Sequence, residues 1–89
     1  MLSRHGEDRR FAAYCLAGIA SALAESGRND DAARAWGAVC AAEESSGFRM
    51  VAPERRRYER RLVRFEGGDA WNAGRRLTVE AAVDALDLS

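Results

Sequence analysis

The amino-acid sequence predicts an all-α domain: an antiparallel helical hairpin over residues 8–46, followed by closing helices over residues 53–87, with four to five helices in all. Apolar residues recur at spacings of three and four, which is the period of an amphipathic helix. Polar segments that contain glycine separate these stretches, and no stretch alternates as a half-buried strand does. With 89 residues, of which 47% are hydrophobic, the chain suits one small domain over residues 1–89.

The hairpin is predicted from two periodic stretches joined by a short polar turn. Gly27 ends the first helix, about 8–26, and Asn29 or Asp30 is placed to cap the second, about 30–46. Helices joined by so short a turn lie antiparallel. The apolar stripe of the first helix consists of Phe11, Cys15, Leu16, Ile19, Ala20 and Leu23.

The closing segment is predicted to start with a third helix, about 53–66, because Pro53 has the preset φ of a first helical residue. The segment DAWNAG is predicted to form one or two helical turns ended by Gly74, and Thr78 is predicted to cap a last helix, about 79–87. The buried side of the third helix is expected to carry Tyr58, Leu62 and Phe65.

The hairpin has the residue pattern of a tetratricopeptide repeat, in which large, small, glycine and aromatic positions follow in a set order. Small residues at Ala20 and Ala32 let the two helices approach closely, and Trp36 is expected to fill the core between them. Leucines replace the repeat's usual tryptophan and tyrosine at positions 16 and 23. The matching residues are Leu16, Ile19, Ala20, Leu23, Gly27, Ala32, Trp36 and Val39.

Three further segments, AARAWGAVCAAEESSG, APERRRYERRL and AWNAGRRLTVEAAVDAL, follow one another from about residue 31 onward. They resemble the segments A..LLGAA..L.....G, P.ER..YER.L and AW..GR.LS.EEAV..AL at the C-terminal end of large actinobacterial LuxR-type and related signal-transduction ATPase regulators. The resemblance implies a tetratricopeptide-like array that serves as a sensing and interaction platform. In that family the nucleotide-binding domain lies elsewhere in the polypeptide. The chain departs from the pattern between Leu62 and Asp69, where VRFEGG is shorter.

The residues that catalysis needs are scarce in this sequence. The only histidine is His5, so that histidine-based metal sites and nucleophilic triads lack their parts. The adjacent pairs Glu43–Glu44 and Asp30–Asp31 point in different directions on a helix and are expected to be solvated or to cap helices. EGGD has neither a Walker lysine nor a following serine or threonine. We predict a chain that is not an enzyme, with no catalytic, cofactor-binding or metal-binding residues and no cofactor.

Cys15 and Cys40 are predicted to be small buried hydrophobic residues that form no disulfide, which indicates a reducing compartment. The run RRFAAYCLAGIASALA superficially resembles a secretory signal, but Glu7 and Asp8 stand where a positively charged region belongs. No stretch is long and apolar enough to span a membrane. We therefore expect a cytoplasmic protein.

An arginine-rich segment, VAPERRRYERRLVRFEGG, is the candidate binding surface. On a helical wheel Arg56, Arg60 and Arg64 form a row opposite the buried side, with Arg57 beside them. The leading interpretation is that these side chains are solvated or paired within the domain, and an acidic protein surface and nucleic acid are the alternatives. Nucleic acid is disfavoured because the net charge is zero and the aromatic residues that could stack on bases face the core.

The predicted function is a non-catalytic interaction or sensing module, the C-terminal part of a bacterial transcriptional regulator, that acts through protein–protein or interdomain contacts. Since a helical solenoid needs about three repeats, the isolated chain is expected to cover its first helix by forming a homodimer near Phe11 and Tyr14. Trp71 is expected to close the end of the array or to anchor a partner. A nucleic-acid-binding module on the arginine-rich helix 53–66 and a small-molecule pocket between the helices are the alternatives.

Overall fold

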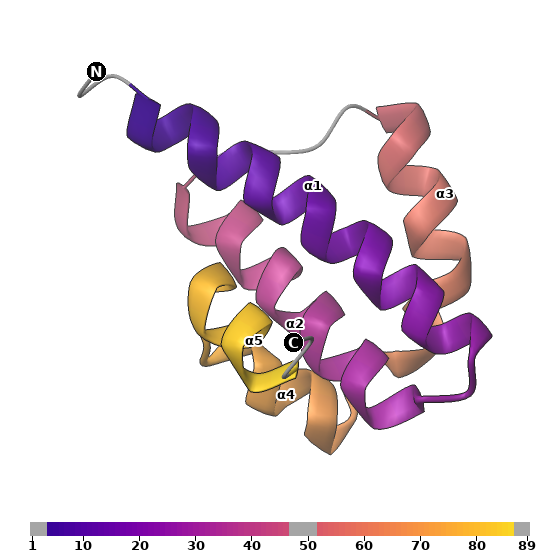
Figure 1. Cartoon of the computed structure of the whole chain (residues 1–89). Helices are drawn as coiled ribbons and strands as arrows, with labels where there is room; N and C mark the ends of the chain where they lie inside the picture. The colour runs from indigo at the N-terminus through magenta and orange to yellow at the C-terminus, as the bar shows by residue number, and fades with distance from the viewer. Residues whose placement is uncertain (1–3, 47–51, 87–89) are drawn as a thin grey trace.

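Helices account for the regular structure of the computed structural model, which describes residues 4–46 and 52–86 (Figure 1). Within these ranges the side chains of 4–12, 46, 52, 54, 79, 80, 83 and 86 are outside the description. The described residues contain no strand, and this confirms the all-α prediction. The elements are α1 (Arg4–Glu25), α2 (Asn29–Ser46), α3 (Ala52–Leu62), the 3₁₀ turn η1 (Val63–Phe65), α4 (Asp69–Arg75) and α5 (Val79–Leu86).

The second helix, α2, is the central element of the fold. α1 lies antiparallel along one side of it, and α4 and α5 pack against the other side (Figure 1). α3 packs mainly against α1. Because α2 is covered on so many sides, residues 35–40 are all buried, which is more than one face of an amphipathic helix. Among the described helices, none has both the length and the apolar character needed to cross a membrane.

The residues predicted to form the hairpin core are buried between α1 and α2. Trp36 is fully buried, and so are the small residues Ala20 and Ala32 that let the helices approach closely. Ile19 is only partly buried. Gly27 has a φ of 83°, a left-handed conformation that glycine adopts without strain, and so it suits the turn between the two helices.

The predicted helix ends are right to within a few residues. The Thr78 hydroxyl accepts a hydrogen bond from the Ala81 backbone N–H at 3.0 Å, which confirms the predicted cap of α5. The predicted cap of α2 is off by one position. The helix begins at Asn29, so Arg28 precedes its first turn instead of Asn29 or Asp30. Helix ends commonly vary by one or two residues.

The link between α3 and α4 is where the prediction of one helix over 53–66 is wrong. The α-helix ends at Leu62, and η1 takes its place as the tighter turn that often ends a helix. Gly67 follows with a φ of 87°, and this left-handed residue reverses the chain toward α4. The reversal lies in the segment VRFEGG, where the sequence departs from the pattern of the family that it resembles.

Two glycines let α2 and α4 cross with their backbones in contact. A Cβ atom at Gly37 of α2 would overlap the Trp71 carbonyl oxygen and lie 3.1 Å from the Arg75 backbone nitrogen. A Cβ atom at Gly74 of α4 would overlap the Arg34 carbonyl oxygen and lie 2.7 Å from its carbonyl carbon. The short helix was predicted to end at Gly74 and ends one residue later, at Arg75. Gly74 also has a role that the sequence did not predict. It is buried inside α4, and its role is to admit the backbone of α2.

Candidate interaction surfaces

Arg55 is the arginine of α3 that ties this helix to the core. Its guanidinium donates hydrogen bonds to the Glu43 carboxylate at 3.0–3.2 Å and to Glu59 at 2.7 Å. It also lies 5.6 Å from the centre of the Trp36 ring. Burial by itself lowers the pKa of Arg55, but the hydrogen bonds and charges of Glu43 and Glu59 outweigh burial and raise this pKa above its usual range. The guanidinium is therefore always charged.

Glu43 was expected to be solvated, and this prediction is wrong because only 4% of the residue is exposed. A carboxylate buried to this extent is stable only when it is paired, and the ion pair with Arg55 joins α2 to α3. The neighbouring Glu44 is exposed and pairs with Arg75 of α4 instead. Position 43 follows Trp36 by seven residues, which places both on one face of α2, and this spacing is the signal that could have located the buried carboxylate.

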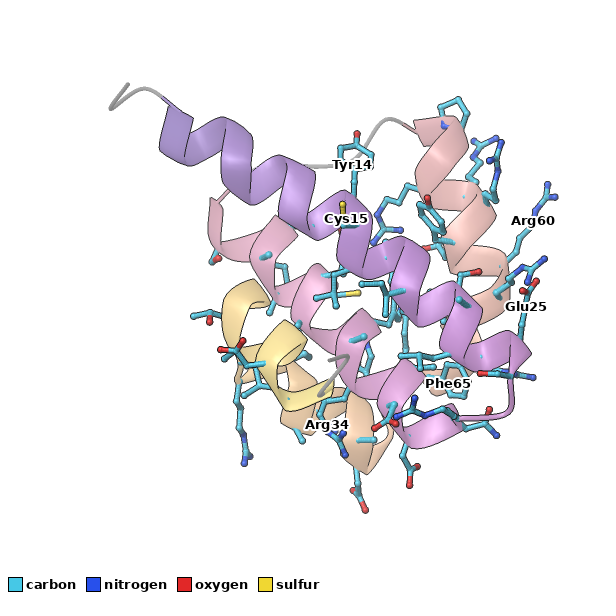
Figure 2. The ribbon with its side chains drawn as sticks, viewed as in Figure 1. Tyr14, Cys15, Glu25, Arg34, Arg60 and Phe65 are labelled. Carbon is cyan, nitrogen blue, oxygen red and sulfur yellow. The ribbon has the colours of Figure 1, made fainter. Side chains whose placement is uncertain are left out.

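Three arginines form what we call the basic face of α3: Arg56, Arg57 and Arg60. All three are exposed, and Figure 2 shows Arg60 extending away from the helix. Among the described residues, no carboxylate forms an ion pair with any of them. Like charges at helical spacings of three and four repel each other by a few tenths of a kcal/mol. Within the described part of the chain, the basic face is thus a positive surface with no carboxylate paired to it.

Arg64, the last arginine of the predicted row, does not belong to the basic face. It lies in η1, beyond the end of α3, so that the expected alignment with Arg56 and Arg60 is lost. Its guanidinium lies 4.8 Å from the centre of the Phe65 ring. This contact is of the cation–π type. Of the predicted row of Arg56, Arg60 and Arg64, the first two lie on α3, with Arg57 beside them as predicted.

The predicted dimer residues lie on α1. Tyr14 is partly buried against the core, and the side chain of Phe11 lies outside the described residues. The prediction that Cys15 is buried is wrong. Its thiol is exposed, because α2 and α3 cover the sides of α1 that carry other residues. Cys15, the half-buried Ile19 and the exposed Ala22 form what we call the outer face of α1. Figure 2 labels Cys15 on this face.

Trp71, the other predicted partner-binding residue, lies on α4. It is partly buried against the core, and its ring lies 4.8 Å from the Arg75 guanidinium. The predicted roles of Trp71, to close the end of the helical array or to anchor a partner, stay predictions. Sequence alone did not reveal how closely its backbone approaches Gly37, because that contact depends on how α4 crosses α2.

Cys40 lies in the core of the domain, as predicted, and is a free thiol. Burial is the main cause that raises the pKa of the Cys40 thiol from its ordinary value of 9.0 to about 11. The negative charge of Glu66 adds to this effect, and the Trp71 indole N–H acts in the opposite direction. At neutral pH the thiol is therefore protonated and, in contrast to the thiol of Cys15, shielded from reagents.

Stability is expected to fall as the pH rises from 9 toward 11. The unfolded chain loses its Cys40 proton near the ordinary pKa of 9.0, whereas the folded chain keeps it up to about 11, so high pH favours the unfolded state. At pH 11 the loss amounts to about 2–3 kcal/mol. Urea unfolding at several pH values between about 8 and 11 measures how the free energy of unfolding falls with pH. Cys40→Ala should flatten this dependence of stability on pH. An unchanged slope in Cys40→Ala contradicts this prediction.

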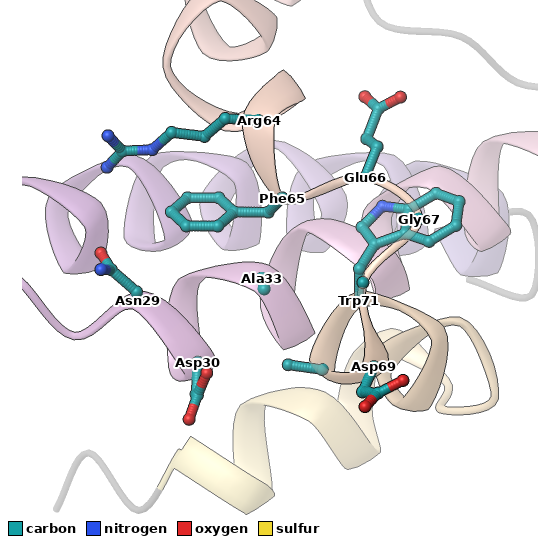
Figure 3. Close-up of a pocket in the computed structure, with 11 residues that line it drawn as sticks. Asn29, Asp30, Ala33, Arg64, Phe65, Glu66, Gly67, Asp69 and Trp71 are labelled. Atoms are coloured by element: carbon teal, nitrogen blue, oxygen red, sulfur yellow. The ribbon is translucent and has the colours of Figure 1, made fainter.

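A pocket of about 500 Å³ lies where the start of α2 meets the turn between η1 and α4 (Figure 3). Phe65 and Trp71 supply aromatic walls, and Arg64 extends beside the Phe65 ring. The rest of the lining includes the acidic residues Asp30, Glu66 and Asp69. Glu66 also accepts a hydrogen bond from the indole of the buried Trp36 at 3.0 Å. Within residues 4–46 and 52–86, no group of three histidine, cysteine or acidic side chains is placed to hold a metal ion.

Comparison of the chain with protein-family models, with curated proteins and with solved structures gave no match. The resemblance to the C-terminal region of LuxR-type regulators therefore stays a prediction from the sequence.

Proposed function

We propose that the chain is a non-catalytic helical interaction module that works through protein–protein or interdomain contacts. The observation that carries this proposal is that residues 11–24 of α1 contain no charged side chain on any side of the helix. A helix that is uncharged and largely apolar all round is typical of a helix that is covered all round. α2, α3 and α5 contact α1, and the outer face of α1 is left for a partner.

The proposed partner of the outer face is another helix, from an adjoining repeat or from a second subunit. The outer face consists of small and apolar side chains, Cys15, Ile19 and Ala22, at spacings of four and three. Such a stripe lets a second helix approach closely and bury apolar surface. The proposed setting is the C-terminal region of a bacterial transcriptional regulator. The sequence resemblance supports it, and so does the burial of six of the eight tetratricopeptide-type positions, all but Ile19 and Gly27.

Self-association of the isolated chain tests this proposal. Light scattering over a concentration series is expected to show a dimer, and Ala22→Arg is expected to weaken dimerisation at least tenfold, about 1.4 kcal/mol, because a charge would be buried without a partner. Ala85→Arg, at an exposed alanine of α5, adds the same charge and is expected to leave the dimer intact. A wild-type chain that is monomeric up to about 1 mM contradicts the proposal.

A nucleic-acid-binding module is the second candidate, and the exposed basic face of α3 is the observation in its favour. Phosphate contacts release counterions, so such binding weakens steeply as the salt concentration rises. The described aromatic residues nearest to the basic face, Tyr58 and Phe65, pack against the core, and thus do not offer rings on which bases could stack. A gel shift at increasing salt with duplex and single-stranded oligonucleotides separates the two candidates.

A further inference from the structure

The net charge of zero conceals an uneven distribution of charge along the chain. The segment 52–65 contains six arginines and two glutamates, a net charge of +4, so the rest of the chain carries −4. Contacts within the domain engage half of these arginines. Arg55 pairs with carboxylates, Arg61 pairs with Glu25, and Arg64 lies over an aromatic ring. The remaining three arginines are the basic face.

The attachment of α3 to the domain depends on its other side. Leu62 is fully buried, Tyr58 packs against the core, and Arg55 pairs with the buried Glu43. The basic face adds no described contact to this attachment, and the mutual repulsion of its charges opposes helix formation. Three arginines gathered on the solvent side of a helix therefore favour an anionic ligand from outside the domain.

The surroundings of the basic face favour a narrow ligand. Glu59 lies on the same helix, Glu25 is held beside α3 by Arg61, and Glu66 and Asp69 line the pocket just beyond its end. A nucleic acid is a continuous polyanion that extends past one helix, and it would meet these carboxylates and the negative remainder of the chain. An acidic peptide segment no wider than one helix would contact the basic face without meeting these carboxylates.

The spacing of the basic face matches another helix. Arg56 and Arg60 are one turn apart, which is about 6 Å along the helix axis. Carboxylates four residues apart on a partner helix repeat at the same distance, and guanidinium and carboxylate groups form short, charge-assisted pairs. We propose that the basic face of α3 binds an acidic helical segment of a partner protein, whose carboxylates are one turn apart. This inference rests on the proposed function as an interaction module but uses a different surface.

Fluorescence anisotropy with a labelled, alanine-based helical peptide tests the inference. One peptide carries glutamates at every fourth residue, on one face of its helix, and a control peptide of the same composition carries them on opposite faces. The one-face peptide is expected to bind more tightly. The triple substitution Arg56→Gln, Arg57→Gln and Arg60→Gln is expected to weaken its binding about tenfold or more. Arg76→Gln, which removes an exposed arginine after α4, is expected to change it less than twofold.

Three results would each overturn the inference: no binding of the one-face peptide, equal binding by the triple variant, or tighter binding of an oligonucleotide with the same number of charges. Circular dichroism of the triple variant establishes that it is folded. The Ala22→Arg variant separates the two proposals, because it should lose self-association and keep peptide binding. Peptide binding without self-association would thus overturn only the proposal for the outer face of α1. Self-association without peptide binding would overturn only the proposal for the basic face.

Discussion

Gly74→Ala is expected to destabilise the domain by at least about 3 kcal/mol, a large part of the stability of a chain this small. The added methyl group would overlap the Arg34 carbonyl oxygen, which belongs to the backbone of α2 and cannot rotate away as a side chain can. α2 and α4 would have to separate, and the packing of Trp71 against the core would be lost with them. Urea unfolding followed by far-ultraviolet circular dichroism measures the change.

Gly68→Ala is the matched control for this prediction. Gly68 has an ordinary extended backbone with a φ of −81°, and its Cβ atom would lie 3.4 Å from its nearest neighbour, the Phe65 carbonyl oxygen. We expect it to change the free energy of unfolding by less than about 1 kcal/mol. Gly37→Ala should act like Gly74→Ala, and the double substitution should cost less than the two together, since both separate the same helices. A wild-type stability of Gly74→Ala would refute the close crossing.

Arg55→Met is expected to destabilise the domain by about 3 kcal/mol. The substitution keeps an apolar side chain against Trp36 but removes the Arg55 guanidinium that pairs with the almost fully buried carboxylate of Glu43. Removing one member of a buried ion pair typically costs about 3–5 kcal/mol because the charge that stays in the interior loses the attraction that offset its desolvation. We place the value at the low end because 17% of the Arg55 side chain reaches solvent. Chemical denaturation measures it.

The control for Arg55→Met is Arg60→Met. It makes the same change five residues later, on the exposed side of α3. It is expected to alter stability by less than about 0.5 kcal/mol. The double variant Glu43→Leu with Arg55→Met should recover most of the loss, because a buried ion pair can be replaced by apolar residues at little cost. If Arg55→Met and Arg60→Met were equally stable, the ion pair would have no structural role.

The helices of this domain were predictable because the evidence for them is local. Apolar spacing along the chain identifies a helix and its inward side, so the burial of Trp36 and Leu62 and the capping of α5 by Thr78 were predicted correctly. The basic face was largely predictable for the same reason, since the inward side of α3 also defines its outward side. The error at Arg64 arose where the chain leaves the α-helix for a 3₁₀ turn.

Other residues were misplaced because their surroundings come from distant parts of the chain. Cys15 is exposed since α3 and α5 flank α1 without covering the side on which it lies. Glu43 is buried since α3 returns to α2 across the intervening loop and brings Arg55 to it. The outer face of α1 became visible as a surface only once the covered sides of that helix were known. The helical period tells which side of one helix each side chain lies on. It does not tell which of those sides another helix covers.

The sequence by itself determined the all-α class, the antiparallel pair of α1 and α2, and an arginine-rich third helix, because each depends on the order of residues within one or two turns. The tertiary structure alone decided that α4 crosses α2 on the paired glycines Gly37 and Gly74 and that a carboxylate lies in the core. Contacts between backbones and burial of charge depend on which helices meet, and at what distance. No spacing within a single helix contains that information.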